Sequence, residues 1–343
     1  MRRIRLFEAI LILATIAIAG NAQPISADPS PIPPATVFLC RTNRILVPPG
    51  WSAPEMLYPQ GRIDYVPVAE LLDKAIRRFT DCTDEQVNPW RRIATPQDRV
   101  AIQVDLQLPP VSRETINAVI DALVNSGVPQ DNIIVYAESE GALFAAGIAV
   151  NSKGRGIRTM GSESEGFRGG LSRIVLDYAT VVINIARLRA DKSLGMRGCV
   201  ANCLAAVPYV ERVRLLAHPE ELASPAANAV LRKRTRLHIL EAYQPVLEDT
   251  GALLPPVWEY RGLLMSSDPV AADVIGMNIL AAKQTETRAG SATDAVAADA
   301  ALKYLQPASS DRLRAGQSNP AKITVETLGT TEDLLIDIPF AAP

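Results

Sequence analysis

The strongest constraint on the fold is an alternation of apolar runs with segments of helical spacing. Val100–Val104 is a β-rich run, Arg113–Asn125 has an apolar helical face, and Ile133–Tyr136 is wholly apolar. Ser112 suits a helix N-cap and Gly127 a helix end. A strand–helix–strand unit of this kind is a right-handed crossover, so we expect its two strands to be parallel.

The alternation continues along the chain. Further strands are predicted at residues 156–160, 181–185, 237–240, 260–265 and 323–326. Helices are predicted near residues 66–79, 195–206, 210–216, 225–231 and 269–283. Strands linked by helices become buried on both faces, so the sequence predicts an α/β fold. We expect a mostly parallel sheet with helices on both faces, built on βαβ units.

Four segments are predicted from this pattern. Residues 1–22 form a signal peptide, and residues 23–97 form a Pro-rich N-terminal segment with one helix. Residues 98–285 form the α/β body, and residues 286–343 form a C-terminal helix, a short strand and a tail. The Pro-rich stretch up to Pro59 is expected to lie extended on the surface of the body.

The first residues have the pattern of a cleaved signal peptide. Three arginines precede an uncharged run, Ala9–Ala19, and Gly20-Asn21-Ala22 has the small-x-small pattern of a cleavage site. The run is about 11 residues long, whereas a spanning helix needs about 20. We therefore expect export to the periplasm or the outside, a mature chain from Gln23, and membrane contact only through an uncleaved signal.

The net charge and the cysteine content limit the partners and the chemistry that we expect of this protein. The formal net charge is only −2, so no nucleic-acid partner is expected. An oxidising compartment makes Cys40 and Cys82 a disulfide candidate. Cys199 and Cys203 are four residues apart, which is poor disulfide geometry on a helix, and whether they are free stays open. No cofactor and no metal site are predicted, since the chain has two histidines and no C-x-x-C.

Two other patterns have competing interpretations. The stretch Ala137–Gly141 follows a strand and centres on Ser139, which is the setting either of a nucleophile elbow or of a helix-capping serine. Arg187 and Arg189 follow the strand at 181–185, where open α/β sheets bind ligands, or they belong to a solvated loop.

Asp268 and Asp273 bracket Pro269 at the start of a helix. Acidic side chains there either complement the helix N-terminus or hold a ligand.

The chain resembles the DUF362 family, whose activity is undefined, from about Asp98 to Asn319. The most specific match is the stretch from Trp258 to Asp273, WEYRGLLMSSDPVAAD, which is similar to the family pattern WEYxGLLxSxDPVAxD. The stretches QVDLQLPP (103–110), VIDAL (119–123) and INI (183–185) resemble the family's strands and first helix. The resemblance implies a fold distantly like that of lactate-racemase-type proteins.

Several positions depart from the family pattern. Gln103 and Asp105 stand where the resemblance would place Lys and Asn, and ARLRAD (186–191) replaces a motif with Lys and His. Ala201-Asn202 stands where a Lys-Asn pair would be. The chain thus has fewer cationic and imidazole side chains at these positions than the family pattern. The metal chemistry of the distant relatives is therefore not carried over.

Together these observations predict binding of a small anionic ligand at the carboxyl ends of the parallel strands, and leave open whether the ligand is transformed. The predicted site consists of Asn184, Arg187, Arg189, Asn202, Asp268 and Asp273. A catalytically degenerate family member that binds a protein partner is the alternative, and a Ser139 hydrolase is the second alternative. If Asn184, Arg187, Asp268 and Asp273 converge in one cleft, this ligand site survives, and if they scatter over the surface, it is rejected.

Overall fold

The structure is a computed structural model that describes residues 30–47, 62–252, 255–287 and 296–336. The predicted signal segment, 1–22, lies outside these residues. The described residues from Ile32 onward form one compact unit, whose sheet takes strands from each of the three segments predicted after the signal. Across the described residues, no helix combines the length and the apolar character needed to cross a membrane.

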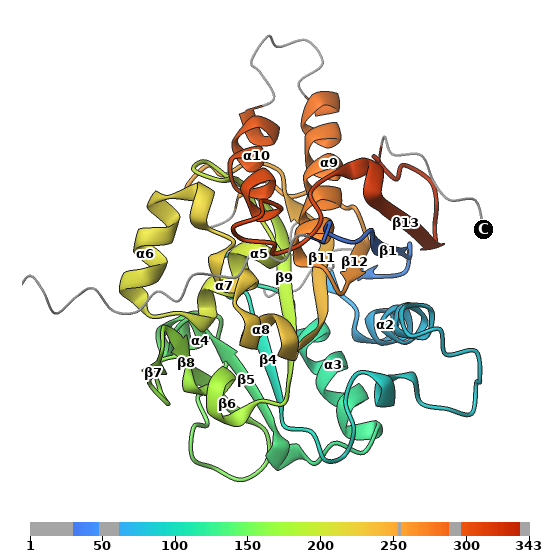
Figure 1. The fold of residues 1–343 in the computed structure, drawn as a ribbon. Helices are drawn as coiled ribbons and strands as arrows, with labels where there is room; N and C mark the ends of the chain where they lie inside the picture. The colour runs from blue at the N-terminus through green and yellow to red at the C-terminus, as the bar shows by residue number, and fades with distance from the viewer. Residues whose placement is uncertain (1–29, 48–61, 253–254, 288–295, 337–343) are drawn as a thin grey trace, which may run out of the picture. The chain divides into compact units, whose positions relative to one another are not determined.

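The core of this unit is a nine-stranded sheet, which Figure 1 shows from one side. The strand order is β13-β1-β12-β11-β9-β4-β5-β6, and β10 pairs with β9. Only β12 and β10 run antiparallel to their neighbours. The predicted α/β class is therefore confirmed. The strands of this sheet are β1 (Ala35–Arg41), β4 (Val100–Val104), β5 (Ile133–Ala137), β6 (Arg158–Gly161), β9 (Val181–Asp191), β10 (Gly195–Arg197), β11 (Thr235–Val246), β12 (Gly262–Ser266) and β13 (Ile323–Gly329).

Two small hairpins lie apart from this sheet. They are β2 (Leu46–Val47) with β3 (Arg62–Ile63), and β7 (Phe167–Arg168) with β8 (Leu171–Ser172).

The predicted crossover unit is present as β4, α3 (Arg113–Asn125) and β5. Ser112 caps α3 by accepting a hydrogen bond from the Thr115 amide. β4 and β5 are buried along their whole length and pair in parallel, with Val100 opposite Ile133. Continuous apolar character follows because both faces of these central strands are covered.

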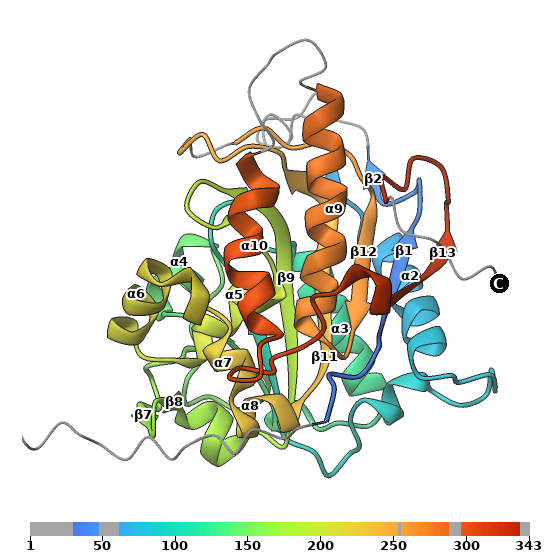
Figure 2. The same ribbon diagram turned by 45° about the horizontal axis from the view of Figure 1, so that its top comes forward.

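Helices cover both faces of the sheet, as Figures 1 and 2 show. On one face, α2 (Tyr65–Phe79), α3 and α4 (Glu140–Ala145) contribute to one apolar core. On the other face, six helices contribute to a second, larger core. These are α5 (Cys199–Asn202), α6 (Tyr209–Ala217), α7 (Ser224–Ala227), α8 (Ala229–Arg234), α9 (Pro269–Thr287) and α10 (Val296–Ala308).

Three predictions about local structure are wrong. The strand predicted over residues 181–185 continues to Asp191, so Arg187 and Arg189 belong to β9 and do not follow it. Residues 35–41 do not lie on the surface, because β1 is inserted between β13 and β12 and is mostly buried. Its sequence, ATVFLCR, is apolar enough for a central strand once the prolines have ended. The helix predicted over residues 195–206 begins only at Cys199, since Gly195–Arg197 pairs with β9 as β10.

Candidate ligand-binding cleft

A buried amide network joins β9 to α5. Asn184 Nδ2 donates to the Cys199 carbonyl at 2.9 Å and lies 3.0 Å from His238 Nδ1. Asn202 Nδ2 donates to Asn184 Oδ1 at 2.6 Å and to the Ile185 carbonyl at 3.0 Å. Asn184 and His238 are almost fully buried, and burial lowers the pKa of His238 to about 3. The neutral imidazole therefore accepts the Asn184 hydrogen bond at Nδ1.

The carboxylate of Asp273 holds the other end of α5. Its two oxygens accept hydrogen bonds from the amides of Cys199 at 2.6 Å and Val200 at 3.0 Å. A Cβ at Gly198 would lie 2.3 Å from Asp273 Oδ1, so this close approach requires glycine. Complete burial raises the pKa of Asp273 to about 7, although both amides oppose the shift. Asp273 thus positions α5 from within the core.

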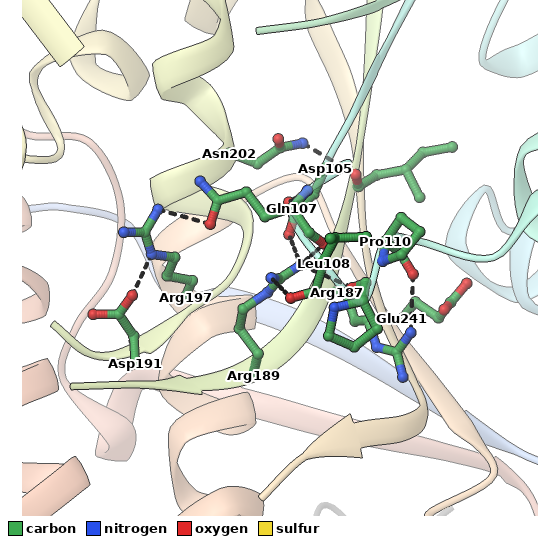
Figure 3. Close-up of polar contacts among 12 residues, drawn as sticks. Asp105, Gln107, Leu108, Pro110, Arg187, Arg189, Asp191, Arg197, Asn202 and Glu241 are labelled. Carbon is green, nitrogen blue, oxygen red and sulfur yellow. Dashed lines mark hydrogen bonds and ion pairs between the residues drawn. The ribbon is translucent and has the colours of Figure 1, made fainter. Parts of the chain in front are cut away.

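Arg187 and Arg189 lie on the opposite face of the sheet from Asn184. Residues of a strand alternate between its faces, and these arginines differ from Asn184 by odd numbers of positions. Arg189 donates to the carbonyls of Gln107, Leu108 and Pro109 and forms an ion pair with Asp105 at 3.0 Å (Figure 3). The two arginines therefore anchor the loop after β4 rather than entering an open site.

Arg187 takes part in the same anchoring. It donates to the Pro110 carbonyl at 2.9 Å and to the Gln244 carbonyl. Glu241 on β11 is buried near Arg187, and it accepts hydrogen bonds from the Ser112 amide and hydroxyl at the start of α3. Burial raises the pKa of Glu241 above its usual value, while Arg187 opposes this. The polar groups here connect β9, β11 and α3.

Asp268 lies at the start of α9, where β12 ends. It accepts hydrogen bonds from the amides of Val270 and Ala271, at 2.9 and 3.0 Å, and from the Gln317 amide at 2.7 Å. Because β12 runs antiparallel to β9, this position is at the end of the sheet opposite the carboxyl end of β9. Asp268 has the capping role that the Asp-Pro pattern permits.

The six predicted site residues do not converge in one cleft. Asn184, Asn202 and Asp273 are grouped around α5. Arg187 and Arg189 anchor a loop on the other face, and Asp268 is at the other end of the sheet. Only Asn202 also lines an open cavity at the carboxyl ends of the parallel strands.

That cavity is a cleft of about 200 Å³ beside the ends of β4 and β5. The chain passes from β4 to β5 and β6 on one side, and then returns to β9 on the other, so the strand order reverses at β4. Such a point is where open α/β sheets bind ligands. The walls combine the end of β4 with α5 and α6. They consist of Val104, Asp105, Leu106, Gln107, Glu138, Ser139, Arg197, Gly198, Ala201, Asn202, Leu204, Ala205, Tyr209, Arg212, Val213 and Leu216.

Two arginines line the cleft. Arg197 is neutralised by Asp191 at 2.5 Å and donates to Gln107 Oε1 at 3.0 Å (Figure 3). Arg212 is only 8% exposed and donates to the Glu138 carbonyl at 2.7 Å. Among the described residues, no carboxylate forms an ion pair with Arg212. Sequence reasoning missed it because it lies within the polar stretch of an ordinary amphipathic helix.

Ser139 lines the cleft as a capping residue. Its hydroxyl accepts a hydrogen bond from the Ala142 amide at 3.1 Å, which starts α4. His238 is bonded to Asn184, and His218 Nδ1 lies 3.4 Å from Glu220 Oε1 at the surface. Since neither histidine hydrogen bonds Ser139, the geometry gives the hydrolase hypothesis no support.

All four cysteines are buried and have free thiols. The structure therefore contains no bond between Cys40 and Cys82. Burial raises the pKa values of Cys40 and Cys203 to about 12. Within the described ranges, no group of three or more His, Cys, Asp or Glu side chains is arranged to hold a metal ion.

The fold and the cleft define an α/β protein with a candidate site where the strand order of a mostly parallel sheet reverses. The family model described as Domain of unknown function (DUF362) matches residues 111–278. The chain is a DUF362 domain-containing protein, which confirms the resemblance found in its motifs. No curated protein and no solved structure matches the chain.

Proposed function

We propose that the protein binds a small anionic molecule in this cleft and that Arg212 receives the anionic group. One observation carries the proposal: Arg212 lines the cleft, is nine-tenths buried, and has a backbone carbonyl but no carboxylate as its partner in the described structure. A charge taken out of water without an opposite charge is costly. An anionic ligand would supply the missing countercharge and form charge-assisted hydrogen bonds with the guanidinium.

The other charges of the cleft favour a ligand with a single negative charge. Arg197 and Asp105 already have partners of opposite charge, Asp191 and Arg189. Glu138 also lines the cleft, and its negative charge would repel a dianion. A carboxylate therefore suits the cleft better than a phosphate, and the side-chain amide of Gln107 offers a neutral hydrogen-bonding group beside it.

Export remains part of the proposal on the basis of residues 1–22. An intact mass that begins at Gln23 in protein made by an exporting host would support it, and a mature protein that keeps Met1 would contradict it.

Benzoate is a suitable first probe, because it joins one carboxylate to a small apolar body. Saturation-transfer NMR should detect binding of benzoate to the full chain. Arg212→Gln should raise the dissociation constant at least about tenfold, because charge-assisted hydrogen bonds contribute about 1.5–3 kcal/mol. Arg212→Lys keeps the charge and should retain part of the affinity. Arg92→Gln, an exposed arginine elsewhere, is the matched control and should bind normally.

Two results would contradict the proposal: no saturable benzoate binding by the wild-type protein, or equal affinity in Arg212→Gln. Circular dichroism of each variant shows whether it is folded. If Arg212→Gln is not folded, the comparison of Arg212→Lys with the wild type decides, because the planar guanidinium fork is lost while the charge is kept.

A further inference from the structure

Helix α6 presents an apolar stripe, which consists of Tyr209, Val210 and Val213, next to the cleft. Tyr209, Val210 and Val213 are 70%, 79% and 49% exposed. Tyr209, Val213 and Leu216 are spaced by four and three residues, so they share one face of the helix, and all three line the cleft. An exposed apolar surface that continues into a cleft is typical of a binding site.

The stripe is contiguous with the cation proposed to receive the anionic group. The guanidinium carbon of Arg212 lies 5.9 Å from the centre of the Tyr209 ring. The remaining charged side chains of α6 are engaged elsewhere, because Arg214 forms ion pairs with Glu211 and Glu221. On α6, the surface beside Arg212 is therefore apolar.

The small volume of the cleft indicates that a ligand would extend beyond it. A volume of about 200 Å³ is smaller than the roughly 300–1,000 Å³ that is usual for sites enclosing a whole ligand. A ligand whose anionic group is held at Arg212 would extend past the cleft, and Tyr209, Val210 and Val213 are positioned to cover the extending part.

We infer that the ligand is an amphipathic monocarboxylate of the fatty-acid type. Its carboxylate meets Arg212, and its alkyl chain lies along Tyr209, Val210 and Val213. This inference rests on the proposed function and adds the substrate class. A straight alkyl chain fits the stripe because the stripe offers apolar contacts and no further charge to match.

A chain-length series tests the inference. Titrations of the full protein with butanoate, hexanoate, octanoate and decanoate, below their micelle concentrations, should show the dissociation constant falling about fourfold for each added methylene that is buried against the protein. Tyr209→Ser and Val213→Ser should weaken octanoate binding at least about fivefold and leave butanoate binding nearly unchanged. Val66→Ser is the control, since Val66 is 54% exposed on α2 and α2 covers the other face of the sheet.

The outcomes distinguish a failure of this inference from a failure of the proposed anion site on which it rests. A chain-length effect that is lost in Tyr209→Ser but kept in Val66→Ser supports a fatty-acid-type ligand. Equal affinity along the series, with binding still dependent on Arg212, overturns the inference and leaves the anion site in place. Absence of binding for every member of the series, together with no benzoate binding, overturns both.

Discussion

The position of a side chain along β9 decides its role. Asn184 faces α5 and satisfies polar groups from α5 and β11, whereas Arg187 and Arg189 face the loop after β4. The side chain of each of these residues is at most 7% exposed. At such positions a polar group is stabilising only when its partners are present, so its loss affects several elements together.

The Asn184→Leu variant tests this at one residue. The substitution keeps the branching and the number of side-chain heavy atoms, but it removes the amide that hydrogen bonds His238 Nδ1, the Cys199 carbonyl and Asn202 Nδ2. Asn202 Nδ2 keeps its bond to the Ile185 carbonyl. Unsatisfied buried groups cost about 1–3 kcal/mol each, so we expect a loss of about 3 kcal/mol in the free energy of unfolding, measured with urea. Asn125→Leu, at an exposed position of α3, should change it by no more than about 0.5 kcal/mol. A loss below 1 kcal/mol for Asn184→Leu would contradict the role assigned to the amide.

The same strand shows what sequence reasoning can and cannot establish about the site. The sequence pattern draws attention to the polar residues of β9, since Asn184 and the two arginines interrupt an apolar run. The pattern predicts a strand that ends at residue 185 and places Arg187 and Arg189 after it near a ligand, whereas β9 continues to Asp191. Their pairing with β4 loop carbonyls and Asp105 depends on contacts about 80 residues away in the chain, which local pattern does not reveal.

At the scale of elements, the central βαβ unit follows from local pattern and β1 does not. Ser112, the apolar face of α3 and the two apolar strands agree with one another, so the crossover was predictable. β1 follows a Pro-rich stretch, and its partners, β12 and β13, come more than 200 residues later. Composition alone assigned it to the surface, because strand pairing at that distance leaves no local signal.

The burial of β1 leads to a prediction about its cysteine. Cys40 is enclosed between α2 and the sheet, and the structure has four free thiols. Ellman's reagent should therefore react with four thiols per chain in denaturant without reductant. In the native protein it should react with far fewer, because burial and raised pKa values suppress the thiolates of Cys40 and Cys203. A count of two in denaturant would instead support the disulfide between Cys40 and Cys82.

At the scale of the whole molecule, two buried groups give opposite pH dependence to stability. The pKa of His238 is lowered from 6.5 to about 3, so its contribution is present above pH 6.5 and is lost as the pH falls towards 3. The pKa of Asp273 is raised from 3.8 to about 7, so its contribution is present below pH 3.8 and is lost as the pH rises through 7. Between about pH 4 and 6.5 the two effects oppose each other.

Single variants should separate the two effects. With rising pH, the stability of the wild type relative to His238→Gln should increase up to about pH 6.5, and its stability relative to Asp273→Asn should decrease up to about pH 7. Each slope should reach at most about 1.4 kcal/mol per pH unit. Both differences should be constant above about pH 8, which serves as the internal control. Slopes of the same sign in urea titrations across this range would contradict the assignment.

The pairing of β1 with β13 has a consequence for how the protein is made. The ribosome synthesises β1 before every other strand of the sheet, and β13, which lies beside it from Ala35 opposite Ile323, after all of them. One edge of the apolar β1 therefore stays unpaired until almost the whole chain has emerged, and it needs protection from aggregation during that interval. The delay suits a chain predicted to leave the cytoplasm, because a polypeptide with an unfinished sheet can still be threaded through a translocation channel.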